Sequence, residues 1–300
     1  MSAVILVTGC KGQLGFELRR ALAPLATIVA VDRSRCDLGN EGSIRECVRS
    51  LKPALIVNAG AYTAVDKAET DRELAFAVNA TAPRILAEEA ARCGAALIHY
   101  STDYVFNGSK ADAYLETDEP DPLGVYGASK LQGERDIGAV GVPHWVFRTS
   151  WVYGLHGNNF LKTMLRLAQQ RDSLSVVADQ FGAPTSAQLI ADVTAMVARD
   201  FLQKRPVAFG LYHLVAAGKT NWHGYAQRAI ARATEKGFGA RVAAEHIQAI
   251  PASAYPTPAR RPVNSVLDCS RLEAALGIRL PDWTLSVDQT IDLLMENRTV

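Results

Sequence analysis

Residues 4–15 read Val4-Ile5-Leu6-Val7-Thr8-Gly9-Cys10-Lys11-Gly12-Gln13-Leu14-Gly15. An apolar, β-branched run typical of a buried strand is followed by three evenly spaced glycines and then by an apolar helical pattern. In such a unit the first glycine permits a tight turn, the second lets the backbone approach a pyrophosphate, and the third allows close helix–strand packing. The free N–H groups at the start of the helix favour phosphate. We therefore predict a dinucleotide-binding loop that contains Gly9, Gly12 and Gly15.

An acidic residue stands where such a unit needs one. Asp32 follows the second predicted strand, Thr27–Val31, and lies twenty residues after Gly12. There a carboxylate accepts hydrogen bonds from an adenosine ribose, and its charge disfavours a 2′-phosphate. Arg33 is able to neutralise such a phosphate, so NADH and NADPH both remain open. A flavin or another nucleotide is the alternative to this assignment.

The first half of the chain alternates strand and helix patterns. Further buried strands, apolar without alternation, are expected at Ala54–Asn58, Ala95–Ser101 and Trp145–Thr149, the last as the sixth strand. Helical patterns cover roughly residues 12–22, 43–51 and 71–93. This order predicts an α/β fold of the Rossmann type, with a doubly wound parallel sheet.

The second half changes character and predicts a smaller, mostly helical C-terminal substrate domain. Helical patterns cover roughly residues 158–171, 186–203, 221–235 and 283–297, and Pro251–Pro262 carries four prolines that indicate an extended loop. We expect residues 1–152, with roughly 175–216 returning to the sheet, to form the NAD(P)-binding Rossmann domain. Roughly residues 153–174 and 217–300 are expected to form the second domain.

Composition excludes several classes of protein. The 300 residues are 48% hydrophobic and 21% charged, which is ordinary for a globular chain. The 32 Lys and Arg against 31 Asp and Glu leave a charge of +1, so no footprint for nucleic acid or an anionic membrane is present. The five cysteines are scattered and argue against a disulfide framework or a zinc site. With no leader pattern and no long apolar run, we expect a soluble, cytoplasmic protein.

A tyrosine and a lysine carry the sharpest chemical signal. Tyr126 and Lys130 are four residues apart and share one helix face. A neighbouring ammonium favours the phenolate, so we expect Lys130 to lower the pKa of Tyr126 toward the working range of an acid–base catalyst. Thr102 ends the fourth predicted strand, at the edge where doubly wound sheets bind ligands. The small residues after the third strand, Asn58-Ala59-Gly60-Ala61, would let a cofactor lie close.

These motifs resemble the extended short-chain dehydrogenase/reductase family, and in particular its members that reduce 4-keto sugar nucleotides. Blocks between residue 4 and about residue 268 carry the resemblance: Tyr62–Glu69, His99–Phe106, Arg148–Tyr153, Asn158–Met164, Asp179–Thr185 and Ser253–Pro258. The resemblance implies an oxidoreductase that reduces the C4 ketone of dTDP-4-dehydro-β-L-rhamnose (dTDP-4-dehydrorhamnose) with NADPH or NADH. The product would be dTDP-β-L-rhamnose, in the final step of its biosynthesis.

The resemblance also implies roles for single residues. Tyr126 would protonate the C4 oxygen, Lys130 would hold the nicotinamide ribose, and Thr102 would hydrogen-bond the sugar at the reacting centre. The implied cofactor-binding residues are Gly9, Gly12, Gln13, Leu14, Gly15, Asp32, Arg33, Asp37, Leu38, Ala61, Tyr62, Thr63, Tyr126 and Lys130. The implied substrate-binding residues are Thr102, Asp103, Trp151, Asn159 and Arg261. As an alternative, Asn159 would cap a helix. Arg261 is a diphosphate ligand by analogy, and its alternative is to be a solvated loop residue. The remaining tryptophans, Trp145, Trp222 and Trp283, are expected in the core.

One departure concerns magnesium. Some members of the family are thought to dimerise through a magnesium ion held by acidic side chains, and Glu17 and Glu296 match two such positions. A third position holds Gln188, and losing a carboxylate weakens a site for a hard cation. We therefore expect no required metal, and a monomer or a weak homodimer.

Two other functions are open at this level. One is a sugar-nucleotide epimerase or dehydratase of the same family, although Tyr104 stands after Asp103 where dehydratases typically carry a glutamate. The other is a non-catalytic regulatory subunit like that of methionine adenosyltransferase. A binding protein of that kind can retain Thr102, Tyr126 and Lys130 from a catalytic ancestor.

Overall fold

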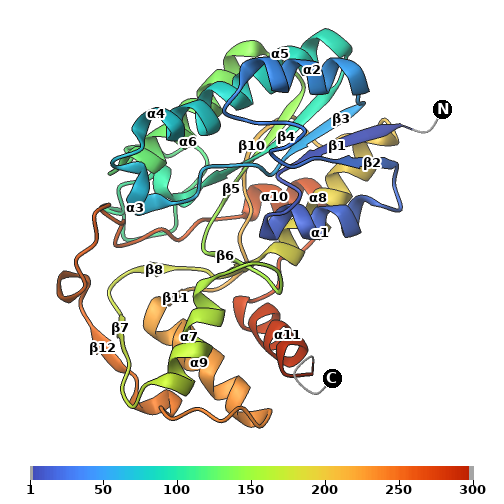
Figure 1. The fold of residues 1–300 in the computed structure, drawn as a ribbon. Helices are drawn as coiled ribbons and strands as arrows, with labels where there is room; N and C mark the ends of the chain where they lie inside the picture. The colour runs from blue at the N-terminus through green and yellow to red at the C-terminus, as the bar shows by residue number, and fades with distance from the viewer. Residues whose placement is uncertain (1–2, 297–300) are drawn as a thin grey trace.

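A six-stranded parallel sheet organises the N-terminal part of the molecule (Figure 1). The computed structural model describes residues 3–296. Residues 1–2 begin the first predicted domain, residues 297–300 end the second, and residue 297 ends the last predicted helix; all of these lie outside the described residues. In sheet order the strands are β10 (Gly210–His213), β5 (His144–Thr149), β4 (Ala96–Thr102), β3 (Leu55–Asn58), β1 (Val4–Thr8) and β2 (Thr27–Ala30). The predicted doubly wound sheet is confirmed. In chain order, however, β5 is its fifth strand and β10 its sixth.

Both faces of the sheet are covered, which explains why its strands are apolar without alternation. Ile5 and Val7 face one core, formed with α1 (Gln13–Leu22), α8 (Ala187–Leu202) and α10 (Ser270–Leu276). Leu6, between them, faces the other core, formed with α2 (Glu41–Leu51), α5 (Ala82–Cys93) and α6 (Val125–Val140). Successive side chains of a strand point to opposite faces, so each needs an apolar partner.

The helix expected over residues 71–93 is continuous but contains a π-helical turn. It runs through α4 (Arg72–Phe76), η1 (Ala77–Thr81) and α5, and α3 (Val65–Ala68) precedes it. In the π turn the buried Asn79 amide donates to Ser129 Oγ on α6 at 3.1 Å and accepts from the Tyr62 backbone N–H at 2.9 Å. Such turns are frequent at functional sites because they redirect a side chain. This one ties the loop after β3 to α6.

A smaller, mostly helical unit lies beside the sheet edge (Figure 1). Its helices and short strands are β6 (Val152–Tyr153), α7 (Phe160–Gln170), β7 (Ser175–Val177), β8 (Phe181–Gly182), β9 (Thr185–Ser186), β11 (Thr220–Asn221), α9 (Trp222–Glu235), η3 (Ala244–His246), β12 (Gln248–Ile250), η4 (Ala252–Ala254) and α11 (Trp283–Glu296). A core of its own lies mainly among α7, α9 and α11. The exact domain division remains a prediction.

No helix within residues 3–296 is long and apolar enough to cross a membrane.

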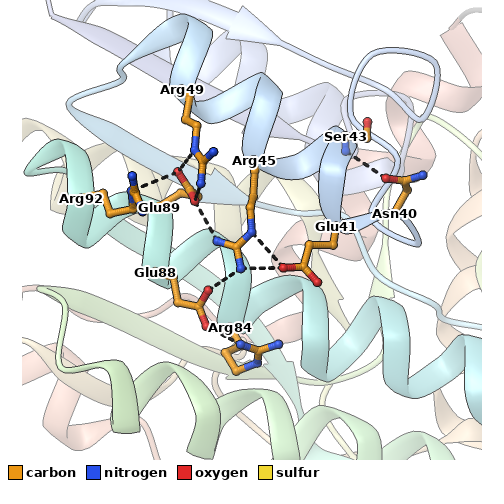
Figure 2. A network of polar contacts seen from close by, with 9 residues as sticks. All are labelled: Asn40, Glu41, Ser43, Arg45, Arg49, Arg84, Glu88, Glu89 and Arg92. Carbon is orange, nitrogen blue, oxygen red and sulfur yellow. Dashed lines mark hydrogen bonds and ion pairs between the residues drawn. The ribbon is translucent and has the colours of Figure 1, made fainter.

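An ion-pair network joins α2 to α5 on the outer side of the sheet (Figure 2). Glu89 is almost fully buried, and its carboxylate accepts hydrogen bonds from Arg49 at 2.7 and 2.8 Å and from Arg45 at 2.7 Å. Arg45 also binds Glu41 and Glu88. The Arg49 hydrogen bonds are the largest cause that lowers the pKa of Glu89, to about 2.

We expect Glu89→Gln to lower the free energy of unfolding at neutral pH by about 1–2 kcal/mol, since it leaves two partly exposed guanidinium groups without their buried partner. A carboxyl with a depressed folded-state pKa stabilises the fold above its unfolded pKa of about 4.3, and this contribution is lost as the pH falls toward about 2. The difference between variant and wild type should therefore shrink in acid. Denaturant unfolding at several pH values measures it. Glu41→Gln, at an exposed member of the network, should change stability much less, and equal effects of the two variants would contradict the assignment.

Candidate active site

The main cavity, of about 960 Å³, opens at the carboxyl ends of the sheet strands, beside the point between β1 and β3 where the strand order reverses. Ligands of doubly wound sheets bind at this point. The glycine-rich loop after β1 forms one wall. Gly9 has a φ of +66°, and a β-carbon there would lie 2.6 Å from Gly60 in the loop after β3. A β-carbon on Gly15 would lie 2.1 Å from the Gly9 carbonyl oxygen. Because Gly9 has no side chain, the backbone of the loop after β1 packs directly against the backbone of the loop after β3.

The structure brings most of the predicted cofactor residues together. Those that line the main cavity are Gly9, Gly12, Gln13, Leu14, Asp32, Arg33, Ala61, Thr63, Tyr126 and Lys130. A neighbouring cavity of about 240 Å³ shares Gly9, Asp32, Arg33 and Ala61 and adds Asp37, Leu38 and Tyr62. Gly15 lies behind the loop, where it allows helix α1 to approach β1.

The Asp32 carboxylate is bound by Lys11 and Ser34, which are close to it in the structure. Its carboxylate pairs with Lys11 and accepts hydrogen bonds from the Ser34 backbone N–H at 3.0 Å and the Ser34 hydroxyl at 2.6 Å. The Lys11 hydrogen bond is the largest cause that lowers the pKa of Asp32. Arg33 pairs with Asp37 at 3.3 Å. Two cations, Lys11 and Arg33, thus lie beside the predicted ribose site, where they would offset the repulsion between Asp32 and a 2′-phosphate.

The predicted catalytic side chains come from two neighbouring elements. Thr102 ends β4, and Tyr126 and Lys130 lie on the first turns of α6. The carboxylate of Glu69 accepts a hydrogen bond of 2.9 Å from the Val125 backbone N–H and so holds the start of that helix. All three side chains line the main cavity.

Burial, not the lysine, dominates the acidity of Tyr126, which differs from our expectation. Burial raises the pKa of Tyr126 to about 12, and the Thr102 hydrogen bond only opposes that shift. Lys130 Nζ donates instead to the Tyr100 carbonyl oxygen at 2.5 Å, on β4. Burial lowers the pKa of Lys130 to about 8. Helical spacing placed the two side chains on one face but did not predict that the lysine turns toward the strand.

A buried polar chain behind Lys130 escaped the sequence analysis. Lys130 Nζ lies 3.2 Å from His99 Nε2, and His99 Nδ1 lies 3.0 Å from the side-chain nitrogen of Asn58. An ammonium has only donors, so a neutral His99 accepts through Nε2, and its Nδ1 then carries the hydrogen and donates toward the Asn58 side-chain amide. Burial lowers the pKa of His99 well below its usual range, which agrees with that state. Only its position next to the Tyr100-Ser101-Thr102 strand end hinted at this role.

Two tryptophans form a wall of the cavity. Trp151 has a φ of +47°, which is rare and strained for a bulky side chain. Its ring stacks on Trp222 with centroids 3.7 Å apart, and a β-carbon at Gly182 would lie 2.8 Å from it. Trp222, which we expected in the core, lines the cavity instead. It is the first residue of α9. Trp145 and Trp283 are buried as expected.

Two predicted substrate residues lie outside the cavity lining. Asn159 caps α7, because its Oδ1 accepts a hydrogen bond of 3.0 Å from the Lys162 backbone N–H, and its Nδ2 donates to Gln13 Oε1 at 2.9 Å. Arg261 forms a paired contact with Asp66 at 2.8 and 3.0 Å. A diphosphate would compete with Asp66 for this guanidinium. Both assignments to substrate remain predictions.

The positions that suggested magnesium lie on α1, α8 and α11. The Glu17 carboxylate accepts a hydrogen bond of 3.0 Å from Arg20, which also binds Asp192. Gln188 lies on α8 and Glu296 ends α11. Among residues 3–296 no group of three His, Cys, Asp or Glu side chains is arranged to hold a metal ion.

Buried polar atoms on the cavity wall mark it as a ligand site. Within the described part of the chain, Ser101 Oγ, Thr149 Oγ1 and Asp103 Oδ2 are buried without a hydrogen-bond partner, and all three residues line the cavity. An unpaired buried polar group is costly, so such groups usually meet a ligand or an ordered water.

Comparison with known proteins identifies the family. The RmlD substrate binding domain family matches residues 3–296. A dTDP-4-dehydrorhamnose reductase of Escherichia coli K12 is 48% identical over 300 residues, which cover 99% of each chain. The chain belongs to the dTDP-4-dehydrorhamnose reductase family.

Other relatives agree with this assignment. A dTDP-4-dehydrorhamnose reductase of Burkholderia thailandensis is 47% identical, covering 97% of this chain and 99% of its own. The crystal structure of a dTDP-4-dehydrorhamnose reductase from Bacillus anthracis in complex with NADP superposes with a TM-score of 0.87 at 31% identity, covering 98% of this chain and all of that one. The present chain thus has the fold of a dTDP-4-dehydrorhamnose reductase over nearly its full length.

Proposed function

We propose that this protein reduces the C4 ketone of dTDP-4-dehydro-β-L-rhamnose with NADPH or NADH to give dTDP-β-L-rhamnose. The observation that carries the proposal is the placement of Tyr126, Thr102 and Lys130 on one wall of a cavity that begins at the glycine-rich loop. The chain around them is 48% identical to a dTDP-4-dehydrorhamnose reductase.

The residues present fit a nicotinamide dinucleotide. Gly9 and Gly15 leave no room for side chains, so the loop offers backbone N–H groups at the start of α1 to a pyrophosphate. Asp32 would take the adenosine ribose, and Lys11 and Arg33 would tolerate a 2′-phosphate. When bound, NAD(P)H supplies the hydride for the reduction.

Tyr126 would act as the general acid. Reduction of a ketone leaves an alkoxide that needs a proton, and a phenol with a raised pKa remains protonated at neutral pH. Thr102 lies beside it at the reacting centre. Lys130, held by the Tyr100 carbonyl and by His99, would place an ammonium under the site and favour the negative charge that Tyr126 acquires.

The smaller unit would bind the sugar nucleotide. Trp151 and Trp222 present an apolar wall to the sugar, and Arg261 would reach the diphosphate by exchanging Asp66 for a phosphate oxygen. For the oligomeric state we propose a monomer or a weak homodimer.

Enzymatic assay of the purified protein tests this function. Freshly made dTDP-4-dehydrorhamnose should cause loss of the reduced-nicotinamide absorbance with NADPH and with NADH, and NMR should identify dTDP-L-rhamnose as the product. An epimerase or dehydratase would recycle the hydride and consume no cofactor. A regulatory subunit would bind cofactor without turnover, and its partner enzyme would co-purify with it. Either result would reject the reductase.

A further inference from the structure

A segment of the smaller unit lies against the glycine-rich loop. This segment, residues 154–159, joins β6 to α7 and is called the strap below. Two of its residues, Gly157 and Asn158, line the main cavity, as do Gly12 and Gln13 at the start of α1. The strap therefore borders the place where a pyrophosphate would bind, although it belongs to the unit to which we assign the substrate.

The Gln13 side chain joins the start of α1 to the smaller unit. Its Oε1 accepts a hydrogen bond of 2.9 Å from Asn159 Nδ2, and its Nε2 donates to the Val152 carbonyl oxygen at 3.4 Å. Gly157 has a φ of +74°, and a β-carbon there would lie 3.2 Å from Gln13 Cγ. The strap thus approaches Gln13 closely, and both polar atoms of the Gln13 amide are held by β6 and the strap.

A second contact reaches the glycine-rich loop from the same segment. His156 Nε2 lies 3.0 Å from the Lys11 carbonyl oxygen, and a carbonyl can only accept, so Nε2 carries a hydrogen and donates it. The imidazole also stacks on the Phe16 ring of α1, with centroids 4.8 Å apart and planes 7° apart. Since His156 and Phe16 are exposed while Gln13 and Asn159 are half-buried, water competes more strongly for this second contact.

The strap is fixed to its own helix. Asn159 Nδ2 also donates to the Gly154 carbonyl oxygen at 2.8 Å, and Asn159 Oδ1 caps α7 by accepting from the Lys162 backbone N–H. Lys162 Nζ donates to the carbonyl oxygens of Leu155 and of Gly157, the latter at 2.9 Å. The strap therefore presents a preformed surface to the glycine-rich loop.

We propose that the strap is part of the cofactor site, where Asn159 and His156 hold the glycine-rich loop in the conformation that binds the pyrophosphate. Asn159 acts through Gln13, and His156 acts through the Lys11 carbonyl. Both are positioning residues, because neither lines the main cavity. A loop that is already held in its bound conformation loses less freedom on binding, which favours affinity. This inference rests on the proposed function and goes beyond it by assigning Asn159 to the cofactor and not to the substrate.

The test is Asn159→Ser in the full-length protein, titrated with NADPH and followed by nicotinamide fluorescence. Serine remains a good helix cap, but its shorter side chain does not reach Gln13. We expect the Kd for NADPH to rise about five- to tenfold, as for the loss of a neutral hydrogen bond. ADP-ribose, which has both phosphates but no nicotinamide, should lose affinity by the same factor in competition with NADPH. At saturating NADPH, kcat and the KM for the sugar nucleotide should stay within about twofold of wild type.

Asn221→Ser is the matched control. Asn221 caps α9 in the same way: its Oδ1 accepts a hydrogen bond of 2.7 Å from the Gly224 backbone N–H, and its Nδ2 donates to the Ala178 carbonyl oxygen at 2.8 Å. Neither partner belongs to the glycine-rich loop, so the Kd for NADPH should stay at the wild-type value. A loss of NADPH affinity as large as that of Asn159→Ser would assign the effect to helix capping and would overturn the proposal.

A pair of histidine variants keeps the test decisive if Asn159→Ser folds poorly. His156→Ala changes an exposed side chain and should raise the Kd for NADPH about two- to threefold. His223 Nε2 makes a similar hydrogen bond of 2.9 Å with the Ile247 carbonyl oxygen, within the smaller unit. His223→Ala should therefore leave the Kd unchanged. Equal Kd values for His156→Ala and wild type would contradict the role of this contact.

A double-variant cycle tests whether Asn159 acts through Gln13. Gln13→Ala removes the group to which Asn159 donates, so adding Asn159→Ser to Gln13→Ala should lower NADPH affinity no further. If the two losses multiply instead, Asn159 acts by another route and the proposal is wrong.

Failure of this inference and failure of the proposed function are distinguishable. If Asn159→Ser keeps the wild-type affinity for NADPH, or raises only the KM for the sugar nucleotide, the strap does not hold the cofactor loop and the reductase assignment stands. If wild type binds NADPH but does not reduce the 4-keto sugar nucleotide, the proposed function is wrong, and the binding titrations still decide for or against the strap.

Discussion

Tyr126→Phe is expected to lower kcat for ketone reduction by about 10²–10⁴-fold, the usual contribution of a positioned general acid. The substitution removes one oxygen from a half-buried ring and leaves the cavity shape almost unchanged. Cofactor affinity should therefore stay within a few fold of wild type. Steady-state kinetics and a nicotinamide fluorescence titration measure the two quantities separately.

Tyr104→Phe is the matched control for this prediction. The Tyr104 ring lies edge-on to Tyr126 with centroids 5.9 Å apart, and it lines the same cavity. Loss of the Tyr104 hydroxyl should cost less than about tenfold, because the proposal places the proton donor for the C4 oxygen at Tyr126. A larger loss in Tyr104→Phe than in Tyr126→Phe would move the role of the acid to Tyr104.

Gly15→Ala is expected to have the largest effect on cofactor binding without touching the cofactor. Its new β-carbon would lie 2.1 Å from the Gly9 carbonyl oxygen and 2.8 Å from the Cys10 Cα, which are backbone atoms that cannot rotate away. The loop would have to shift and give up the 2.9 Å hydrogen bond from Gly12 N–H to Gly9 O. We expect a loss of about 2 kcal/mol or more in the free energy of unfolding, and a cofactor affinity about a hundredfold lower.

Gly138→Ala provides the comparison. Gly138 lies in α6 with no atom within 4 Å of the added β-carbon, so the change should stabilise the protein by about 0.5–1 kcal/mol. Thermal unfolding and cofactor titration of both variants measure the contrast. If Gly15→Ala binds cofactor like wild type, the close approach of α1 to the loop is not what shapes the phosphate site.

The polar chain behind Lys130 shows how the strands and α6 act together. His99 and Asn58 lie on adjacent strands, and the Thr8 hydroxyl donates to Asn58 Oδ1 at 2.6 Å at the end of β1. Buried polar contacts thus run from the end of β1 through Asn58 and His99 to Lys130 on α6. Lys130 is therefore held in place by the sheet and not by its own helix.

Local patterns in the sequence were enough for the fold and for the kind of cofactor. Strand and helix periods, the glycine spacing and Asp32 depend on residues close together in the chain, so they are readable without a structure. The positions of Tyr126 and Lys130 on one helix face follow from helix geometry alone. The longer blocks of resemblance added the substrate class, which spacing does not contain.

Only the tertiary structure decided what surrounds these residues. His99 lies 41 residues from Asn58, and Arg261 lies 195 residues from Asp66, so neither contact leaves a local pattern. The turn of Lys130 toward β4, the place of Trp222 on the cavity wall and the burial of Asp103 have the same origin. Burial and hydrogen bonding set the acidity of a side chain, and both depend on which distant segments pack against it. The sequence by itself therefore determined which groups are present, and the packing of β4, α6 and the smaller unit decided which of them hold a proton.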